Sequence, residues 1–141
     1  MAYDTDNIFA KILRGEAPCI KVYEDEHTLA FMDIMPQMDG HTLVIPKQEA
    51  ETLYDLSETS ALACMKTVQH VGKAVAKAMN FEGTTIFQHN GKAAGQTVPH
   101  FHFHILPGPI FGAKALKGHA VEFADTDELQ AIADKIIACL D

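Results

Sequence analysis

Three histidines alternating with phenylalanines, in the run His100-Phe101-His102-Phe103-His104, are the residues best suited to chemistry in this chain. Side chains on a β-strand switch faces at every residue. The alternation therefore predicts three imidazoles on one face, roughly 6–7 Å apart, and two phenylalanines pointing into a core. Imidazoles can transfer protons, attack as nucleophiles or bind metals near neutral pH. Burying three of them without partners would be costly, so we interpret this face as functional.

A metal site is one interpretation of the histidine face. Zinc needs ligand atoms about 2.0–2.1 Å from one ion in a tetrahedron, and two histidines at alternate strand positions can chelate it. The outer two, His100 and His104, would lie roughly 13 Å apart on a flat strand, which makes a three-histidine site difficult. The chain has neither a Cys-x-x-Cys pair nor a His-Glu-x-x-His run. We therefore expect no metal and no required cofactor.

Nucleophilic catalysis on phosphorus is the favoured interpretation. A neutral imidazole attacks, and a covalent intermediate divides one difficult step into two easier ones. Neighbouring histidines can stabilise the phosphate oxygens and protonate the leaving group. The turn Gly95-Gln96-Thr97 precedes the histidines. Its glycine lets the backbone approach an anion, and its other two side chains supply donors. Asn90 would lie close by if the two neighbouring strands pair. The other histidines (His27, His70, His89 and His119) have no converging partners in the sequence, and we expect them to have no role in the site.

Composition limits the class of protein. A length of 141 residues favours one domain with one core. The net charge of -8 comes from 11 basic and 19 acidic residues and argues against nucleic-acid or anionic-membrane partners. The first residues lack the features of a signal peptide, and no apolar run approaches the roughly 20 residues of a membrane span. The three cysteines are far apart and odd in number, so we expect no disulfide framework and a cytoplasmic location.

The elements that must position the histidines follow from periodicity and from turn residues. Apolar spacing predicts a short N-terminal helix over 7–15, a short helix over 49–56, and a C-terminal helix over 126–140. Ser57 is the expected N-cap of a long helix ending near residue 80. Its predicted buried stripe consists of Leu62, Met65, Val68, Val71, Val75 and Met79. The predicted strands cover 21–25, 28–33, 41–45, 84–89 and 99–106, and 107–118 is expected to be a loop.

Short connections between the early strands require antiparallel pairing. We therefore expect one α+β domain over residues 1–141, in which a five-stranded antiparallel sheet carries a long helix and a short N-terminal helix. The core is expected over 7–107, followed by a C-terminal loop and helix over 108–141. A sheet of this size leaves edges exposed, and pairing with a second subunit is one way to cover one of them.

The segment from Gly95 to Leu106 resembles the signature of the histidine triad (HIT) superfamily, in which three histidines alternate with apolar residues. Two further blocks are similar to parts of the same family. Residues 30–37 and 40–47 resemble its upstream strand pair, and residues 7–16 resemble its N-terminal helix. The order and spacing of the three blocks make the resemblance specific.

The resemblance implies a HIT-like fold whose sheet continues across a homodimer, and a purine nucleotide of the AMP or GMP type as ligand. It also implies the hydrolysis or transfer of nucleotidyl groups. The middle histidine, His102, matches the nucleophile, His104 the contact to the α-phosphate, and His100 the residue that orients the nucleophile. Further matches are His41 as a supporting histidine; Gln96 and Thr97 near the scissile bond, between Gly95 and Val98; Asn90 near the phosphate; Asp33 at the ribose with Ile34 beside it; and Ile8, Phe9 and Phe31 around the base.

Departures from the family pattern narrow the expected activity. A third histidine at position 104, where the uridylyltransferase branch has glutamine, favours a hydrolase. The zinc-type Cys-x-x-Cys of some bacterial members is absent, and so is the Trp-Pro-Pro-Gly ending of the eukaryotic Hint branch. The chain is most similar to a bacterial-type Hint-like branch. The expected substrates are nucleoside phosphoramidates or adenylated and guanylated compounds, and Thr97 is an expected catalytic residue that, with its neighbours, helps to protonate the leaving group. Dinucleoside polyphosphate hydrolysis and a nucleotide-binding scaffold dimer with weak catalysis are the alternatives.

Overall fold

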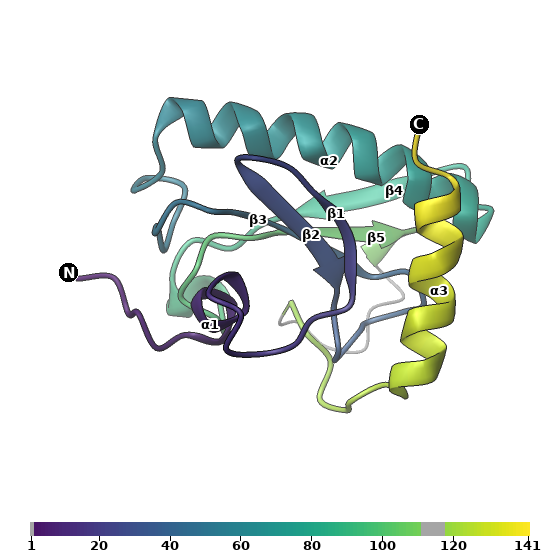
Figure 1. Cartoon of the computed structure of the whole chain (residues 1–141), viewed down its shortest axis with the longest axis horizontal. Coiled ribbons are helices and arrows are strands. Elements are labelled where there is room, and N and C mark those ends of the chain that lie inside the picture. Colours follow the sequence, from purple (N-terminus) through teal and green to yellow (C-terminus); the bar gives the residue numbers. More distant parts are fainter. Residues whose placement is uncertain (1, 111–117) are drawn as a thin grey trace.

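An antiparallel sheet in the order β1-β2-β3-β5-β4 organises the molecule (Figure 1). The computed structural model describes residues 2–110 and 118–141. The strands are β1 (Lys21–Glu24), β2 (Thr28–Met32), β3 (Thr42–Pro46), β4 (Thr84–Phe87) and β5 (Phe103–Pro107). The α+β fold with a five-stranded antiparallel sheet is confirmed.

Helices cover the sheet on both faces. The long helix α2 (Glu58–Met79) lies along one face, and the short helix α1 (Ile8–Leu13) lies on the other (Figure 1). Helix α3 (Thr126–Ala138) packs against α2 and β1, and the 3-10 helix η1 (Lys92–Ala94) precedes β5. Ser57 caps α2 as expected, because its side chain accepts a hydrogen bond from the Ser60 amide.

Strand alternation divides the apolar residues between two clusters. Ala30, Met32, Val44 and Ile105 pack with α2 and α3, whereas Leu29, Phe31, Leu43 and Ile45 pack with Phe9 of α1. Phe103 packs with the first cluster, as predicted for the phenylalanine face. His104 is its neighbour in β5 and therefore points to the opposite face, where α1 lies. The core thus fixes the face on which the histidines are presented.

Three local predictions were wrong. Residues 49–56 form turns and bends instead of a helix. In α2, Leu62 and Met65 are 71% and 48% exposed, because the buried face begins at Cys64 and Thr67. Strand β5 begins at Phe103, so His100 and His102 lie in the segment before the strand and only His104 belongs to it. Part of the predicted loop over 107–118 lies outside the described residues.

Strands β1 and β4 form the edges of the sheet. The expected homodimer, in which the sheet continues into a second subunit, stays a prediction. In the described part of the chain, no helix is both long enough and apolar enough to cross a membrane.

Candidate active site

Imidazole rings from four parts of the chain converge beside β5. The ring of His104 lies 4.8 Å from that of His102, 5.1 Å from His41, 5.1 Å from His119 and 6.0 Å from His89, measured between centroids. His41 precedes β3, His89 follows β4, and His119 precedes α3. The structure therefore assembles a larger cluster than the three histidines and His41 that the sequence predicted.

The nucleophile candidate His102 is held by its own segment. Its Nδ1 lies 2.7 Å from the carbonyl oxygen of His100, which can only accept, so Nδ1 carries the proton and Nε2 keeps its lone pair. Burial lowers the pKa of His102 to about 3, which keeps the ring neutral. The edge of the Phe9 ring packs on the imidazole at 5.0 Å between centroids. His102 thus has the tautomer and charge state that an attacking imidazole needs.

A second pair, His41 and His104, presents a proton donor. The Gln37 amide donates to His41 Nδ1 at 3.0 Å, so the proton of His41 is on Nε2. That Nε2 donates to His104 Nδ1 at 2.9 Å, and the remaining proton of His104 is therefore on its own Nε2. Burial lowers the pKa of His41 to about 4, and burial together with the neighbouring histidines lowers that of His104. This chain leaves a neutral N–H on His104 that can bind an oxyanion.

His100 links the site to the N-terminal segment. Its Nε2 donates to the carbonyl oxygen of Pro46 at 2.9 Å, and the Tyr3 hydroxyl donates to its Nδ1. Asn7 in turn donates to the Tyr3 oxygen at 2.8 Å. Because both ring nitrogens of His100 are bonded, its carbonyl is held in place to receive His102. The orienting role of His100 stays a prediction.

His119, for which the sequence predicted no role, enters the site from a segment that follows the undescribed residues. This segment, residues 118–124, is called the C-terminal strap below. Asp33 Oδ2 accepts a hydrogen bond from His119 Nδ1 at 2.5 Å, and the same oxygen lies 3.4 Å from His41 Nε2. The His119 ring is stacked 5.5 Å from that of His102 at an interplanar angle of 27°. Asp33 is therefore buried between two histidines.

Three buried ring nitrogens have no hydrogen-bond partner within the described ranges 2–110 and 118–141, namely Nε2 of His89, His104 and His119. Buried polar atoms are normally paired, so these nitrogens indicate a ligand site. One ring nitrogen each of His102, His104 and His119 lies within 4.8 Å of the other two. Ligand atoms on a tetrahedral zinc lie roughly 3.4 Å apart. An upper limit of 4.8 Å does not show that these nitrogens are that close to one another. A tetrahedral phosphoryl group, which is bound through its oxygens, fits wider spacing. The absence of a metal stays a prediction.

The residues expected around a nucleotide base lie next to the histidines, at α1 and β2. Phe9 and Phe31 are buried and meet edge to face at 5.3 Å between centroids. Ile8 and Ile34 are 45% and 47% exposed, which leaves apolar surface available to a ligand. The carboxylate of Asp33 is 3% exposed, and its Oδ1 accepts the Met35 amide at 2.8 Å. Its contact with a ribose stays a prediction.

The turn before the histidines is built by Gln96. Its Oε1 accepts the Gly91 amide at 2.7 Å, and its Nε2 donates to the carbonyls of Glu51 and Val98. Gln96 therefore positions the loop with the side-chain atoms that were expected to bind a ligand. Thr97 is exposed beside it, Val98 packs against the cluster around Phe9, and Gly95 adopts a positive φ of 105° under the His89 ring.

Asn90 is tied to a neighbouring loop, and the adjacent His89 faces the histidine cluster; the contact of Asn90 with a phosphate stays a prediction. The Asn90 Oδ1 accepts hydrogen bonds from the Leu53 amide at 2.8 Å and from Gln88 Nε2 at 2.6 Å, which ties it to the adjoining loop. The His89 ring, one residue earlier, faces His104 instead. Burial lowers the pKa of His89, so it too is held neutral.

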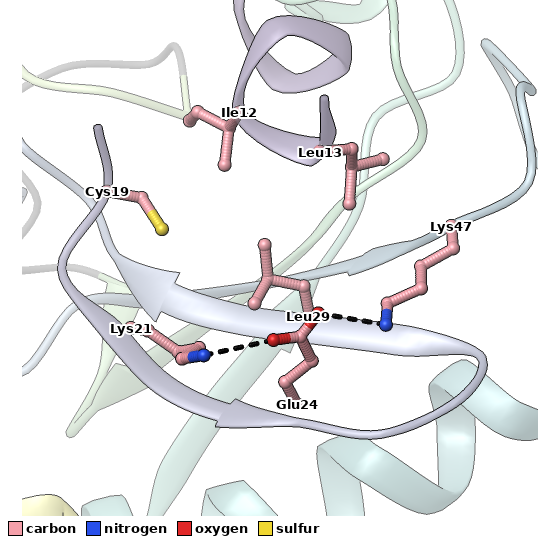
Figure 2. A pocket seen from close by; sticks show the side chains of 7 residues that line it. All are labelled: Ile12, Leu13, Cys19, Lys21, Glu24, Leu29 and Lys47. Atoms are coloured by element: carbon pink, nitrogen blue, oxygen red, sulfur yellow. Dashed lines mark hydrogen bonds and ion pairs between the residues drawn. The ribbon is translucent and has the colours of Figure 1, made fainter. Parts of the chain in front are cut away.

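A separate hollow of about 500 Å³ lies between α1 and the β1–β2 hairpin (Figure 2). Glu24 pairs there with Lys21 at 3.0 Å and with Lys47 at 2.9 Å, above an apolar floor that includes Leu29. None of the histidines lines this hollow. Its two lysines share one carboxylate, and none of its lining residues belongs to the histidine cluster.

His89, Tyr3 and His119 were not predicted from the sequence, and the last two were missed because their partners are remote. Tyr3 is 97 positions from His100, and His119 is 86 positions from Asp33. Both lie outside the 7–107 region that carries the resemblance. The number of histidines, eight in 141 residues, was the only signal in the sequence, and it does not distinguish His119 from His27.

Comparison with known proteins decides the family. The HIT domain matches residues 14–109. The chain belongs to the HIT family. A Hit-like protein of Bartonella henselae, solved by crystallography, aligns with 99% of this chain and 100% of its own at 44% identity and a TM-score of 0.86. Its resemblance covers the C-terminal region as well as the histidine segment.

The names of several relatives state an activity. An adenosine 5′-monophosphoramidase of Schizosaccharomyces pombe is 44% identical over 102 residues, which are 72% of this chain and 74% of that protein. An adenylylsulfatase of Arabidopsis thaliana is 32% identical over 139 residues, 96% of this chain and 68% of that protein. The HIT relatives of this chain thus include hydrolases of adenylated compounds.

Proposed function

We propose that this HIT protein is a nucleotidyl hydrolase. It would bind a purine nucleoside monophosphate group and release it from a phosphoramidate or a related adenylated compound, through a covalent intermediate on His102. The observation that carries this proposal is the bond from His102 Nδ1 to the His100 carbonyl, which leaves Nε2 unprotonated. The names of the fission yeast and Arabidopsis relatives support the adenylated substrate class.

The geometry supports a division of labour in the first step. His102 Nε2 forms a bond to the α-phosphorus, and the bond from phosphorus to the leaving group breaks. Charge grows on the phosphoryl oxygens, for which the neutral N–H of His104 is a donor with no hydrogen-bond partner of its own in the described residues. The proton on His102 Nδ1 stays bonded to the His100 carbonyl and stabilises the positive charge that the modified ring acquires.

Hydrolysis of adenosine 5′-phosphoramidate tests the proposal. The wild-type protein should release AMP, and His102→Ala should lower kcat/KM at least about 10⁴-fold, since removing a nucleophile removes the covalent route. His27→Ala is the matched control, because His27 is exposed and its ring lies beside Glu26 rather than among the clustered histidines. AMP binding by calorimetry reports whether the variant keeps its pocket. Full activity in His102→Ala would contradict the assignment.

A further inference from the structure

We propose that His119 is the acid–base residue of this site: it gives a proton to the leaving group and then takes one from the attacking water. This inference rests on the proposed function and deepens it. The sequence assigned proton delivery to Thr97 and its neighbours, whereas the described structure places a carboxylate-bound imidazole beside the nucleophile.

The contact with Asp33 sets the orientation of His119. An ionised carboxylate only accepts, so the proton on His119 Nδ1 points to Asp33 Oδ2, and Nε2 points away from it. That Nε2 is buried and has no partner among residues 2–110 and 118–141. A carboxylate on one nitrogen and a free second nitrogen are the arrangement by which a histidine acts as general base and then as general acid.

The other histidines of the cluster are committed to different tasks. Both ring nitrogens of His41 and both of His100 are hydrogen-bonded. His102 has only its nucleophilic nitrogen free, and His104 faces the site with an N–H while its Nδ1 accepts from His41. His89 has a free Nε2, but no carboxylate is hydrogen-bonded to its ring. His119 alone in the described cluster has a free nitrogen and a carboxylate at hydrogen-bond distance.

The position of His119 fits contact with the reacting groups. Its ring is stacked on that of His102, and one nitrogen of each lies within 4.8 Å of the other. A phosphoryl group attacked by His102 Nε2 would therefore hold its leaving group within reach of His119, and the covalent intermediate would later receive the attacking water within the same reach. The groups facing His119 are Asp33 after β2, His41 before β3, and His102 and His104 of the triad segment.

The C-terminal strap is fixed at the point where it presents His119. The Ala120 amide donates to the Met35 carbonyl at 2.8 Å, and the Ala124 amide donates to the Ile34 carbonyl at 2.9 Å. Gly118 packs so closely that a Cβ there would lie 2.6 Å from His104 Nε2. The strap therefore runs beside Asp33 and closes the site over His104.

The proton balance closes over one turnover. The cycle starts with His119 protonated on both ring nitrogens. In the first step the His102–phosphorus bond forms, the phosphorus–nitrogen bond breaks, and the amine leaves with its electron pair and the proton from His119 Nε2. In the second step the water oxygen bonds to phosphorus and one water proton passes to His119 Nε2. The electron pair of the His102–phosphorus bond then returns to His102. The products are the amine and the nucleoside monophosphate, and His119 has regained its proton.

Substrates with different leaving groups test this role. The full-length protein is given an adenosine N-alkyl phosphoramidate, whose amine must be protonated, and the para-nitrophenyl ester of AMP, whose phenolate leaves without a proton. In His119→Phe and His119→Gln, kcat/KM for the amidate should fall about 10²–10⁴-fold. For the ester it should fall less than about tenfold. His27→Gln is the control.

The ester also reports the second step. In both His119 variants nitrophenolate should appear as a burst of about one equivalent per site followed by slow turnover, because the covalent intermediate loses the base that activates water. Asp33→Asn should shift both readouts in the same direction by a smaller factor. Mass spectrometry of the quenched reaction should find the nucleotidyl group on His102.

The outcomes separate the two proposals. Equal losses on both substrates, or activity at the wild-type level without a burst, would overturn the role of His119 while leaving a His102-dependent hydrolase. No turnover by the wild-type protein, or turnover retained in His102→Ala, would overturn the proposed function and this inference with it.

Discussion

The triad segment, residues 100–107, and the C-terminal strap bring histidines to the same site in opposite ways. In the triad segment Phe101, Ile105 and Leu106 are fully buried between the histidines and after them. In the strap Val121 and Phe123 are 84% and 72% exposed, and His119 depends on Asp33 and two backbone hydrogen bonds. The geometry of the nucleophile is therefore coupled to the core, whereas that of His119 depends on a few hydrogen bonds with residues 33–35.

Paired phenylalanine truncations should show the largest difference between the two segments. Phe101→Ala removes a side chain with 0% exposure and should lower the free energy of unfolding by about 3–5 kcal/mol. Phe123→Ala makes the same change on the exposed strap and should lower it by less than about 0.5 kcal/mol. Urea denaturation followed by circular dichroism measures both. Comparable losses would show that the strap is part of the core.

The same contrast explains what the sequence could predict. Strand alternation and the Ser57 cap depend on neighbours within a few residues, so the sheet, α2 and the buried face of the triad segment were predictable. The helix expected over 49–56 failed because other loops bind its backbone. The Phe101 amide donates to the Ala50 carbonyl, Gln96 donates to that of Glu51, and Asn90 accepts from the Leu53 amide.

The other wrong predictions concern the position of the buried stripe on α2 and residues whose partners are far away in the sequence. The buried stripe of α2 was misplaced because Thr67, a polar residue, is buried through a 2.6 Å hydrogen bond with Thr28. Tyr3 and His119 have partners on other parts of the fold, and no local pattern marks such contacts. The site was therefore predictable where its residues share one segment.

Acid should destabilise the fold through the buried histidines. The pKa of His41 is lowered to about 4, below the roughly 6.5 of an unfolded chain, so the unfolded state binds more protons between these values. This contribution is complete above about pH 6.5 and is lost as the pH falls toward 4. His41 alone should cost about 2 kcal/mol between pH 7 and pH 5, and His102, whose pKa is about 3, acts in the same direction.

Urea denaturation at pH 7 and pH 5 measures this loss. His41→Gln should show a smaller difference between the two pH values, because it removes one of the groups that titrate. His27→Gln should show the wild-type difference, since His27 is exposed. Equal stability of the wild-type protein at both pH values would mean that these histidines are not buried as neutral rings.

Gly118→Ala should show that the strap contributes to enzyme activity without contributing much to the stability of the core. The added Cβ would lie 2.6 Å from Cε1 and Nε2 of His104, so either the strap or the imidazole must move. His104 is stacked on Phe87 at 4.4 Å and bonded to His41, which makes the strap the part that yields. Displacing His119 in this way should lower kcat/KM for the alkyl phosphoramidate about tenfold, or about 1.4 kcal/mol.

The matched control is Gly83→Ala, because a Cβ at Gly83 would meet no atom within 4 Å. Both variants should unfold within about 0.5 kcal/mol of the wild-type protein, because a Cβ at Gly83 meets nothing and the strap, rather than the buried His104, yields at Gly118. Wild-type activity in Gly118→Ala would mean that the strap does not position His119. A large loss of stability would mean that the strap folds with the core. A loss confined to the amidate would show that a segment with few core contacts can still set the rate, because its one histidine is held by Asp33.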